Sequence, residues 1–334
     1  MKNLASILIL LSVILVSCHK ETDTPAYPVY PSYFPAPVYQ FTTNKLTENG
    51  FLLGRKLFFD PFLSKDGSIS CASCHHPNKY FADEGMAISE GVGGKFGIRN
   101  APSITNTVFT PAFMWDGGVA HLDVSALPAL TDTNEMAETM AHLIEKLNNH
   151  AEYPALFEKA FGSDSIYTQV LFYAFSQYVG SVVSASAKYD KVKQGKASFT
   201  QKEQAGYAIF KTQCNTCHTE PLFTNYSYKN NGLDNNFSED LGRGRITLSP
   251  ADEGKFRVPS LRNVMQTAPY MHGGRFATIN EVLNHYTNGI VQSATLDESL
   301  QNGISLSEAD KTNLILFLHT LTDEDMRNNS KYYE

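Results

Sequence analysis

Two copies of the motif C-x-x-C-H constrain this chain more than any other feature, because they use four of its five cysteines. In each copy, two thiols three positions apart match the two vinyl groups of one haem, and the adjacent imidazole falls beneath the iron as its proximal ligand. One zinc ion shared by both pairs would leave two histidines unexplained. The pattern therefore predicts a dihaem c-type cytochrome with two covalently bound haem c groups. The motif residues are Cys71, Cys74, His75, Cys214, Cys217 and His218.

The fifth cysteine, Cys18, follows a short positive start and an apolar run from Leu4 to Val16 that is too short to span a bilayer. The sequence LVSC at 15–18 resembles the lipobox of bacterial lipoproteins, in which the cysteine becomes the lipidated first residue. The alternative is an ordinary signal peptide with an incidental cysteine. We expect a signal peptide over 1–17, an extended Pro-rich tether over 18–42, and a periplasmic protein that the lipid on Cys18 holds at a membrane.

Length and charge limit what the rest of the chain can be. About 290 residues remain after the leader and tether, which is enough for two compact domains. The net charge of −7 excludes the basic signature of nucleic-acid binding. Because the two motifs lie 143 positions apart, we expect one haem in each domain. The expected N-terminal domain covers 43–187, with 295–328 packing back on it, and the C-terminal domain covers 188–294.

Helical periodicity is the clearest secondary-structure signal. Apolar residues at 136, 140, 143, 144 and 147 share one helical face, 170–183 is apolar and rich in aromatic residues, and Ser307 suits the N-cap of a helix over 307–321. Strand signals are sparse, and clusters of glycine and proline at 90–97 and 230–255 indicate long loops. We expect a mainly α fold of two cytochrome c-like haem domains with long loops and few strands.

Six further segments carry a family resemblance, and they surround the haem motifs in a fixed order. The segments are LGRKLFFDP at 53–61, RNAPS at 99–103, MWDGG at 114–118, EM at 135–136, FRVPSLRNV at 256–264 and TAPYMHGG at 267–274. From about residue 45 to 320, the chain resembles the bacterial dihaem cytochrome c peroxidase family, which includes the MauG-type enzymes. The resemblance implies that the N-terminal haem is the peroxidatic one and that the C-terminal haem transfers electrons.

The loop before the Arg-Asn motif departs from the family pattern. In most members this loop supplies a second histidine that caps the peroxidatic iron. Here no histidine occurs between His76 and His121, and Val92 stands at the expected position. An aliphatic side chain cannot ligate iron, and His76 is adjacent to the proximal ligand and bound on that side. We therefore expect an open sixth coordination position at the first haem.

The resemblance implies two catalytic residues. Glu135 matches the family's distal glutamate, which moves a proton between the two peroxide oxygens, and burial beside a haem would raise its pKa toward neutrality. The alternative is a glutamate favoured near a helix N-terminus. The family's glutamine ten positions earlier is replaced by Ser125. Trp115, the only tryptophan, is either a core anchor or, as the resemblance implies, an electron-transfer residue between the haems.

The resemblance also implies two sets of metal ligands. Family members hold a calcium ion between the domains, and the matching residues are Asn100 through its side-chain oxygen, with Thr267 and Pro269 through their carbonyls. At the second haem, the position of the sixth ligand falls on Tyr286, where MauG-type enzymes have tyrosine and peroxidases have methionine. The alternative ligands are His285 and Met271.

Three functions are compatible with the sequence. The first is a cytochrome c peroxidase that reduces hydrogen peroxide to water with electrons from a small periplasmic cytochrome c or cupredoxin, favoured by the open first haem and Glu135. The second is a MauG-like enzyme that oxidises a protein substrate through a ferryl haem, favoured by Tyr286 and by the missing capping histidine. The third is a passive dihaem electron carrier, which needs neither an open pocket nor an acid/base.

The resemblance also bears on the oligomeric state. Because family members often form dimers, the chain is a candidate homodimer.

Overall fold

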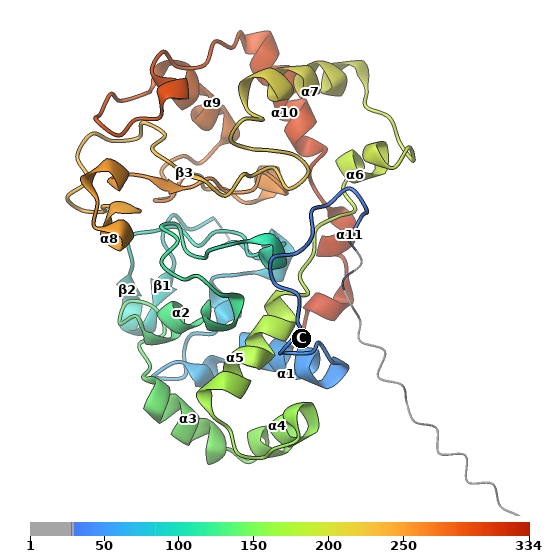
Figure 1. The fold of residues 1–334 in the computed structure, drawn as a ribbon, viewed down its shortest axis with the longest axis vertical. Helices are drawn as coiled ribbons and strands as arrows, with labels where there is room; N and C mark the ends of the chain where they lie inside the picture. The colour runs from blue at the N-terminus through green and yellow to red at the C-terminus, as the bar shows by residue number, and fades with distance from the viewer. Residues whose placement is uncertain (1–27, 29, 84) are drawn as a thin grey trace, which may run out of the picture.

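The computed structural model describes residues 28, 30–83 and 85–334, which form two lobes stacked along the long axis of the molecule (Figure 1). The expected signal peptide and Cys18 lie outside the described residues. The helices are α1 (Glu48–Phe59), α2 (Leu127–Thr131), α3 (Met140–Asn148), α4 (Tyr153–Phe161), α5 (Thr168–Val179), α6 (Lys188–Lys193), α7 (Gln201–Gln213), α8 (Gly244–Thr247), α9 (Ile279–Asn288), α10 (Glu308–His319) and α11 (Glu324–Arg327). The strands are β1 (Glu90–Gly91), β2 (Lys95–Phe96), β3 (Tyr228–Lys229) and β4 (Phe256–Arg257).

The N-terminal lobe is built on the close packing of α1 against α5. Gly54 allows this approach, because a Cβ atom there would lie 2.0 Å from the carbonyl oxygen of Ala174. Leu53 and Leu57 of α1 then enter a core with buried residues of α3, α4 and α5. Removing these side chains from water is the main driving force for assembling the helices around the first haem motif.

The C-terminal lobe uses the same device with α7 and α10. A Cβ atom on Gly206 would lie 1.9 Å from the carbonyl oxygen of Asn313, and the rings of Phe210 and Phe317 lie 5.1 Å apart. As predicted, Ser307 is the N-cap of α10, and its hydroxyl accepts a hydrogen bond from the amide of Asp310 over 3.1 Å.

The end of the chain is divided between the two lobes. The prediction that 295–328 packs on the N-terminal domain is wrong for α10, because Leu314 and Phe317 are buried in the C-terminal core. By contrast, Met326 and Tyr332 pack against the N-terminal lobe. The apolar face of α10 packs against α7. The periodicity of apolar residues predicts that a helix has such a face, but it does not predict which helix packs on it.

Part of the expected tether is packed, which corrects the expectation of an extended segment over 18–42. Phe34 and Phe41 are buried in a core with Phe109 of the N-terminal lobe and Leu222 of the C-terminal lobe. The amide of Tyr39 also donates to the carbonyl of residue 108 over 2.9 Å. The aromatic residues in this Pro-rich segment supply enough apolar surface to hold it down across the boundary between the lobes.

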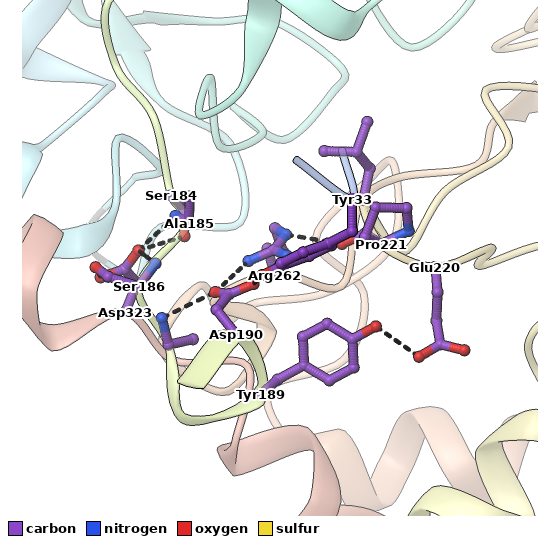
Figure 2. A network of polar contacts seen from close by, with 12 residues as sticks. Tyr33, Ser184, Ala185, Ser186, Tyr189, Asp190, Glu220, Pro221, Arg262 and Asp323 are labelled. Atoms are coloured by element: carbon purple, nitrogen blue, oxygen red, sulfur yellow. Dashed lines mark hydrogen bonds and ion pairs between the residues drawn. The ribbon is translucent and has the colours of Figure 1, made fainter. Parts of the chain in front are cut away.

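A buried polar network joins this segment to the C-terminal lobe (Figure 2). Arg262 and Asp190, whose side chains are fully buried, form a bidentate ion pair with N–O distances of 2.9 and 2.8 Å. The hydroxyl of Tyr33 donates to Asp190 over 2.7 Å, and nearby Asp323 accepts from the amide of Ala185 over 2.8 Å. Since these buried charges have hydrogen-bonded partners, the network fixes the connection between α5 and α6.

The fold class is confirmed as mainly α with long loops and few strands. The strands form two antiparallel pairs, β1 with β2 and β3 with β4, each strand two residues long. The stretch expected at 170–183 is helical as α5, whereas α3 begins at Met140 rather than at Met136. Across the described ranges of the chain, no helix is both long and apolar enough to cross a membrane.

Candidate haem sites

Both C-x-x-C-H motifs fold into the same tight turn. In the first motif, the amides of Cys74 and His75 donate to the carbonyl of Cys71 over 3.2 and 2.9 Å. The second motif repeats both distances to the carbonyl of Cys214. This turn makes two cysteines and one histidine a single local unit, as the attachment of one haem requires.

The two motif histidines are prepared to ligate iron in the same way. Nδ1 of His75 lies 2.9 Å from the carbonyl oxygen of Phe81, and Nδ1 of His218 lies 3.1 Å from that of Pro259. Because a carbonyl only accepts, Nδ1 carries the proton and Nε2 keeps its lone pair for a metal. Burial lowers the pKa of both imidazoles, which favours the neutral form that binds iron.

The two cysteine pairs do not come together as one zinc site. Burial raises the pKa of Cys71 and of Cys214 to about 12, so the neutral thiol is favoured at both positions. The two pairs also belong to different cores, one in each lobe. Among the residues that the structure describes, no three His, Cys, Asp or Glu side chains come together as a metal site.

A cavity of about 870 Å³ lies beside the first motif and reaches the boundary between the lobes. This volume is near the upper end of the range for small-molecule and cofactor sites. The cavity brings together residues that the sequence predicted separately for the first haem, for catalysis and for calcium. The predicted residues in its lining are Cys71, Cys74, His75, Asn100, Trp115, Glu135, Thr267 and Pro269.

Glu135 faces this cavity next to the first motif. Burial, and to a lesser extent the charge of Asp132, raises the pKa of its carboxyl group. The carboxylate in turn adds to the effect of burial in raising the pKa of Cys71 and Cys74, and all three residues line the same cavity. The Glu135 side chain is exposed, and it is part of the cavity lining. Ser125, which replaces the family's glutamine, lines the same cavity.

The loop at 88–97 fixes the backbone at Glu135. The amide of Val92 donates to the Glu135 carbonyl over 2.8 Å, and a Cβ atom on Gly91 would lie 2.1 Å from the carbonyl oxygen of Asn134. Gly91 is therefore needed for this close approach. Among the described residues that line the cavity, this loop contributes 88–91 and 97, and Val92, expected at the capping position, is not one of them.

Trp115 links the two lobes at the wall of the cavity. Its indole Nε1 donates to the carbonyl of Asn100 over 2.8 Å, and its own carbonyl accepts from the amide of Arg257 over 2.7 Å. The side chain is buried. Trp115 is therefore held by main-chain groups from both halves of the molecule.

Asn100 has the geometry of an oxygen donor. Its Nδ2 donates to the carbonyls of Met86 and Ala87 over 3.1 and 3.0 Å, and no hydrogen bond reaches its Oδ1 within the described ranges. Thr267 and Pro269 line the same cavity. An amide oxygen with main-chain carbonyls is a donor set that suits calcium, which prefers hard oxygen ligands.

Tyr286 of α9 and Met271, two of the candidate ligands, both lie in the core that contains the second motif. Tyr286 packs in this core with Cys214, and burial raises the pKa of its phenol to about 12, with a further contribution from the two thiols. Nε2 of His285 lies 2.9 Å from the carbonyl oxygen of Asn231 and so carries a proton, which leaves Nδ1 as the nitrogen of this imidazole with a lone pair for iron. The sulfur of Met271 accepts from Nδ2 of Asn231 over 3.3 Å.

Sequence reasoning missed Asn231, which contacts all three candidate ligands of the second haem. It also missed a charged cluster at the boundary between the lobes. There the fully buried carboxylate of Asp116 accepts from Arg99 and Arg245, each over 2.6 Å, and Arg99 also binds Asp240 over 2.7 Å. Asp116 and Arg99 belong to the segments MWDGG and RNAPS, but the sequence alone does not show that the two side chains form an ion pair.

The fold and the two motifs indicate two haem sites, one in each lobe, and known proteins extend this result. Residues 48–198 match the family model described as di-haem cytochrome c peroxidase. The methylamine utilization protein MauG of Methylophilus methylotrophus is 32% identical, with 87% of this chain and 86% of the relative covered. The cytochrome-c peroxidase IdrP2 of Denitromonas iodatirespirans is 34% identical, with 82% of each covered. A crystal structure of a MauG-like protein associated with microbial copper homeostasis has a TM-score of 0.81 and 31% identity, covering 91% of this chain and 97% of that chain.

The chain therefore belongs to the di-haem cytochrome c peroxidase and MauG family, as its sequence motifs predicted, and it carries two haem cofactors. Relatives named cytochrome-c peroxidase, at 31–34% identity, make it an oxidoreductase of the peroxidase class. The relatives include proteins named cytochrome-c peroxidase and proteins named MauG, so membership of the family does not identify the molecule that is oxidised.

Proposed function

We propose that the chain reduces hydrogen peroxide to water with electrons from a small cytochrome c or cupredoxin. The observation that carries this proposal is the position of Glu135, a carboxyl group with a raised pKa in the cavity beside Cys71, Cys74 and His75. A passive electron carrier needs no acid/base in such a cavity, whereas peroxide cleavage does.

The role of Glu135 follows from its protonation chemistry. Because the pKa of the Glu135 carboxyl group lies above its usual range, the group holds a proton more readily than an ordinary glutamate, so it accepts the proton from one peroxide oxygen and returns it to the other. Water then leaves in place of hydroxide. When bound, the haem next to His75 supplies the iron that takes part in the redox chemistry. Ser125 is a shorter hydrogen-bonding group than the family's glutamine at the cavity wall.

Peroxide addition to the ferric protein in a stopped-flow instrument tests this proposal. We expect a fast spectral change at the first haem without prior reduction of the second haem, since the loop at 88–97 contributes no imidazole as a cap. Steady-state turnover of peroxide with a reduced small cytochrome c or cupredoxin then tests the electron source. The absence of a fast spectral change would remove the peroxidase proposal.

A second candidate function is a MauG-like oxidation of a protein substrate, and the position of Tyr286 favours it. An anionic oxygen ligand favours ferric iron and lowers the reduction potential of the second haem, which makes it a poorer acceptor of electrons from a donor cytochrome. The two candidates differ in where the oxidising equivalents go. Peroxide-dependent oxidation of tryptophan or tyrosine in a partner protein, without turnover of a donor cytochrome, would support the second candidate.

We assign supporting roles to the remaining predicted residues. Trp115 carries electrons between the haems, which its burial at the wall shared by both lobes supports. Asn100, Thr267 and Pro269 bind calcium, which the available amide oxygen of Asn100 supports. Chelation of calcium is expected to slow transfer between the haems, measured as slower re-reduction of the first haem after peroxide treatment, while both haems stay bound.

The proposal also includes where the protein works and how it is divided. Cysteine attachment of both haems, a signal peptide over 1–17, a lipid on Cys18 and a periplasmic location belong together, because c-type haem is attached outside the cytoplasm. We place the domain boundary at 187–188, between α5 and α6, with α10 in the C-terminal domain. Mass spectrometry of the purified protein tests the lipid and both haem attachments.

A further inference from the structure

Arg257 is a cationic side chain in the lining of the cavity beside the first haem motif. It lies in β4, and its amide donates to the carbonyl of Trp115 over 2.7 Å. Its Nε donates to the carbonyl of Met114 over 3.3 Å. These two contacts fix Arg257, a residue of the C-terminal lobe, against the Met-Trp segment of the N-terminal lobe.

The guanidinium of Arg257 has no carboxylate partner within the part of the chain that the structure describes. Arg99 and Arg262 are also inside the molecule, but each pairs with aspartate at 2.6–2.9 Å, and these partners raise their pKa overall against the effect of burial. For Arg257 burial lowers the pKa, and the groups that oppose this effect are the phenols of Tyr226 and Tyr228. Arg257 is half-buried in the cavity wall, and a positive charge held there without an anion is unfavourable, so this site lacks a negative partner.

We propose that Arg257 binds the propionate carboxylate of a haem. The planar guanidinium donates two parallel hydrogen bonds to a carboxylate, which gives the pair both strength and direction. Each haem of the family brings two such carboxylates, and the cavity that Arg257 lines adjoins the first haem motif. The second haem is the other source, because Pro259, two residues further on, holds the proximal His218. The proposal rests on the two haems and not on peroxide as the oxidant.

This contact has a consequence for electron transfer. Reduction of haem iron adds one negative charge, and a nearby guanidinium stabilises the reduced form, so Arg257 raises the reduction potential of the haem that it binds. Since the amide of Arg257 is bonded to Trp115, the same contact holds the propionate edge of that haem next to the indole. Arg257 is thus a positioning residue for the haem edge nearest to Trp115.

Spectroelectrochemical titration of the holoenzyme tests the inference with Arg257→Gln and Arg257→Lys. We expect Arg257→Gln to lower the midpoint potential of one haem and to move the propionate bending band in its resonance Raman spectrum. Arg257→Lys keeps the charge but loses the bidentate geometry, so we expect a smaller shift of the potential in the same direction. A shift at the His75 haem or at the His218 haem identifies which propionate is bound.

The matched control is Arg245→Gln, which removes the same charge from the lining of the same cavity. Arg245 is more exposed and already pairs with Asp116, so it is expected to shift either potential less and to leave the propionate band in place. Unchanged potentials in Arg257→Gln with both haems bound would overturn the inference, as would equal shifts in Arg257→Gln and Arg245→Gln. If Arg257→Gln fails to retain its haems, an unmoved propionate band in Arg257→Lys would overturn it as well.

Discussion

The first and second haem motifs hold their histidines by the same hydrogen bond, from Nδ1 to a main-chain carbonyl, but their surroundings differ. The first motif borders a large cavity that contains Glu135, at the boundary between the lobes. The second motif lies in the C-terminal core, where the phenol of Tyr286 packs beside its thiols. Two identical binding turns can therefore serve different chemistry, because the proximal side attaches the iron and the opposite side decides what else reaches it.

The largest expected effect is that of Glu135→Gln. The amide is close to the carboxyl in size but cannot exchange the proton, so we expect peroxide cleavage to slow by about 10²–10⁴-fold. Stopped-flow absorbance measures the rate, and both haems should remain bound. Glu145→Gln, on the exposed side of α3, is the control and should retain the wild-type rate. An unchanged rate in Glu135→Gln would remove this residue from the mechanism.

Tyr286→Phe sharpens the comparison at the second site. Loss of the phenol oxygen should change the low-spin signal of the His218 haem and raise its midpoint potential, because the anionic ligand favours ferric iron. The first step with peroxide at the other haem should change little. Tyr207→Phe removes a phenol from the same core, where it bonds Glu220, and should leave both spectra intact. Identical spectra of Tyr286→Phe and wild type would point to another ligand.

Gly91→Ala tests how the first cavity is built. The added methyl group would meet the carbonyl oxygen of Asn134, so the backbone at Glu135 has to move. We expect a loss of about 1–3 kcal/mol in stability, as for other overpacked sites, together with slower peroxide cleavage. Gly273→Ala is the matched control, because a Cβ atom there meets no atom within 4 Å. Denaturant unfolding measures the stability, and equal losses in both variants would contradict the proposed contact.

The smallest effect is on the pH dependence of stability. Because burial raises the pKa of Glu135, the folded state disfavours the carboxylate, and the wild type loses stability as pH rises from about 4.5 through the raised pKa. Glu135→Gln lacks this loss, so its thermal midpoint should exceed that of the wild type near pH 7 and match it near pH 4. A difference between the two proteins that does not vary with pH would contradict a raised pKa.

Among the local features, the Ser307 cap of α10 was predicted from a short pattern and is confirmed. Haem attachment at the two motifs and the catalytic role of Glu135 stay predictions, which depend on short patterns and on a strong family resemblance. Predictions that depend on long-range packing did worse. The segment at 30–42 has the composition of a linker, yet its aromatic residues find a core that both lobes supply. The packing of α10 against α7 also depends on contacts between distant parts of the sequence.

The candidate site shows the same limit. Arg257 and Asp116 are charged residues within the segments that carry the family resemblance. Whether each of them forms an ion pair depends on the fold. Asp116 is paired by arginines from both lobes, whereas Arg257 faces the cavity without a carboxylate in the part of the chain described. Similarly, Asn231 forms hydrogen bonds with the candidate ligands of the second haem, through its side chain to Met271 and through its carbonyl to His285. The spacing of residues in the sequence does not predict these contacts.

The unequal character of the two haem sites is the central claim, and a low-temperature EPR spectrum of the resting ferric protein tests it most directly. The account predicts one high-spin signal from the haem at His75, whose distal loop contributes no imidazole, and one low-spin signal from the haem at His218. The low-spin signal should change in Tyr286→Phe, while the high-spin signal should not. Two low-spin signals in the wild type would contradict the account, because the first iron would then be capped as in most of the family.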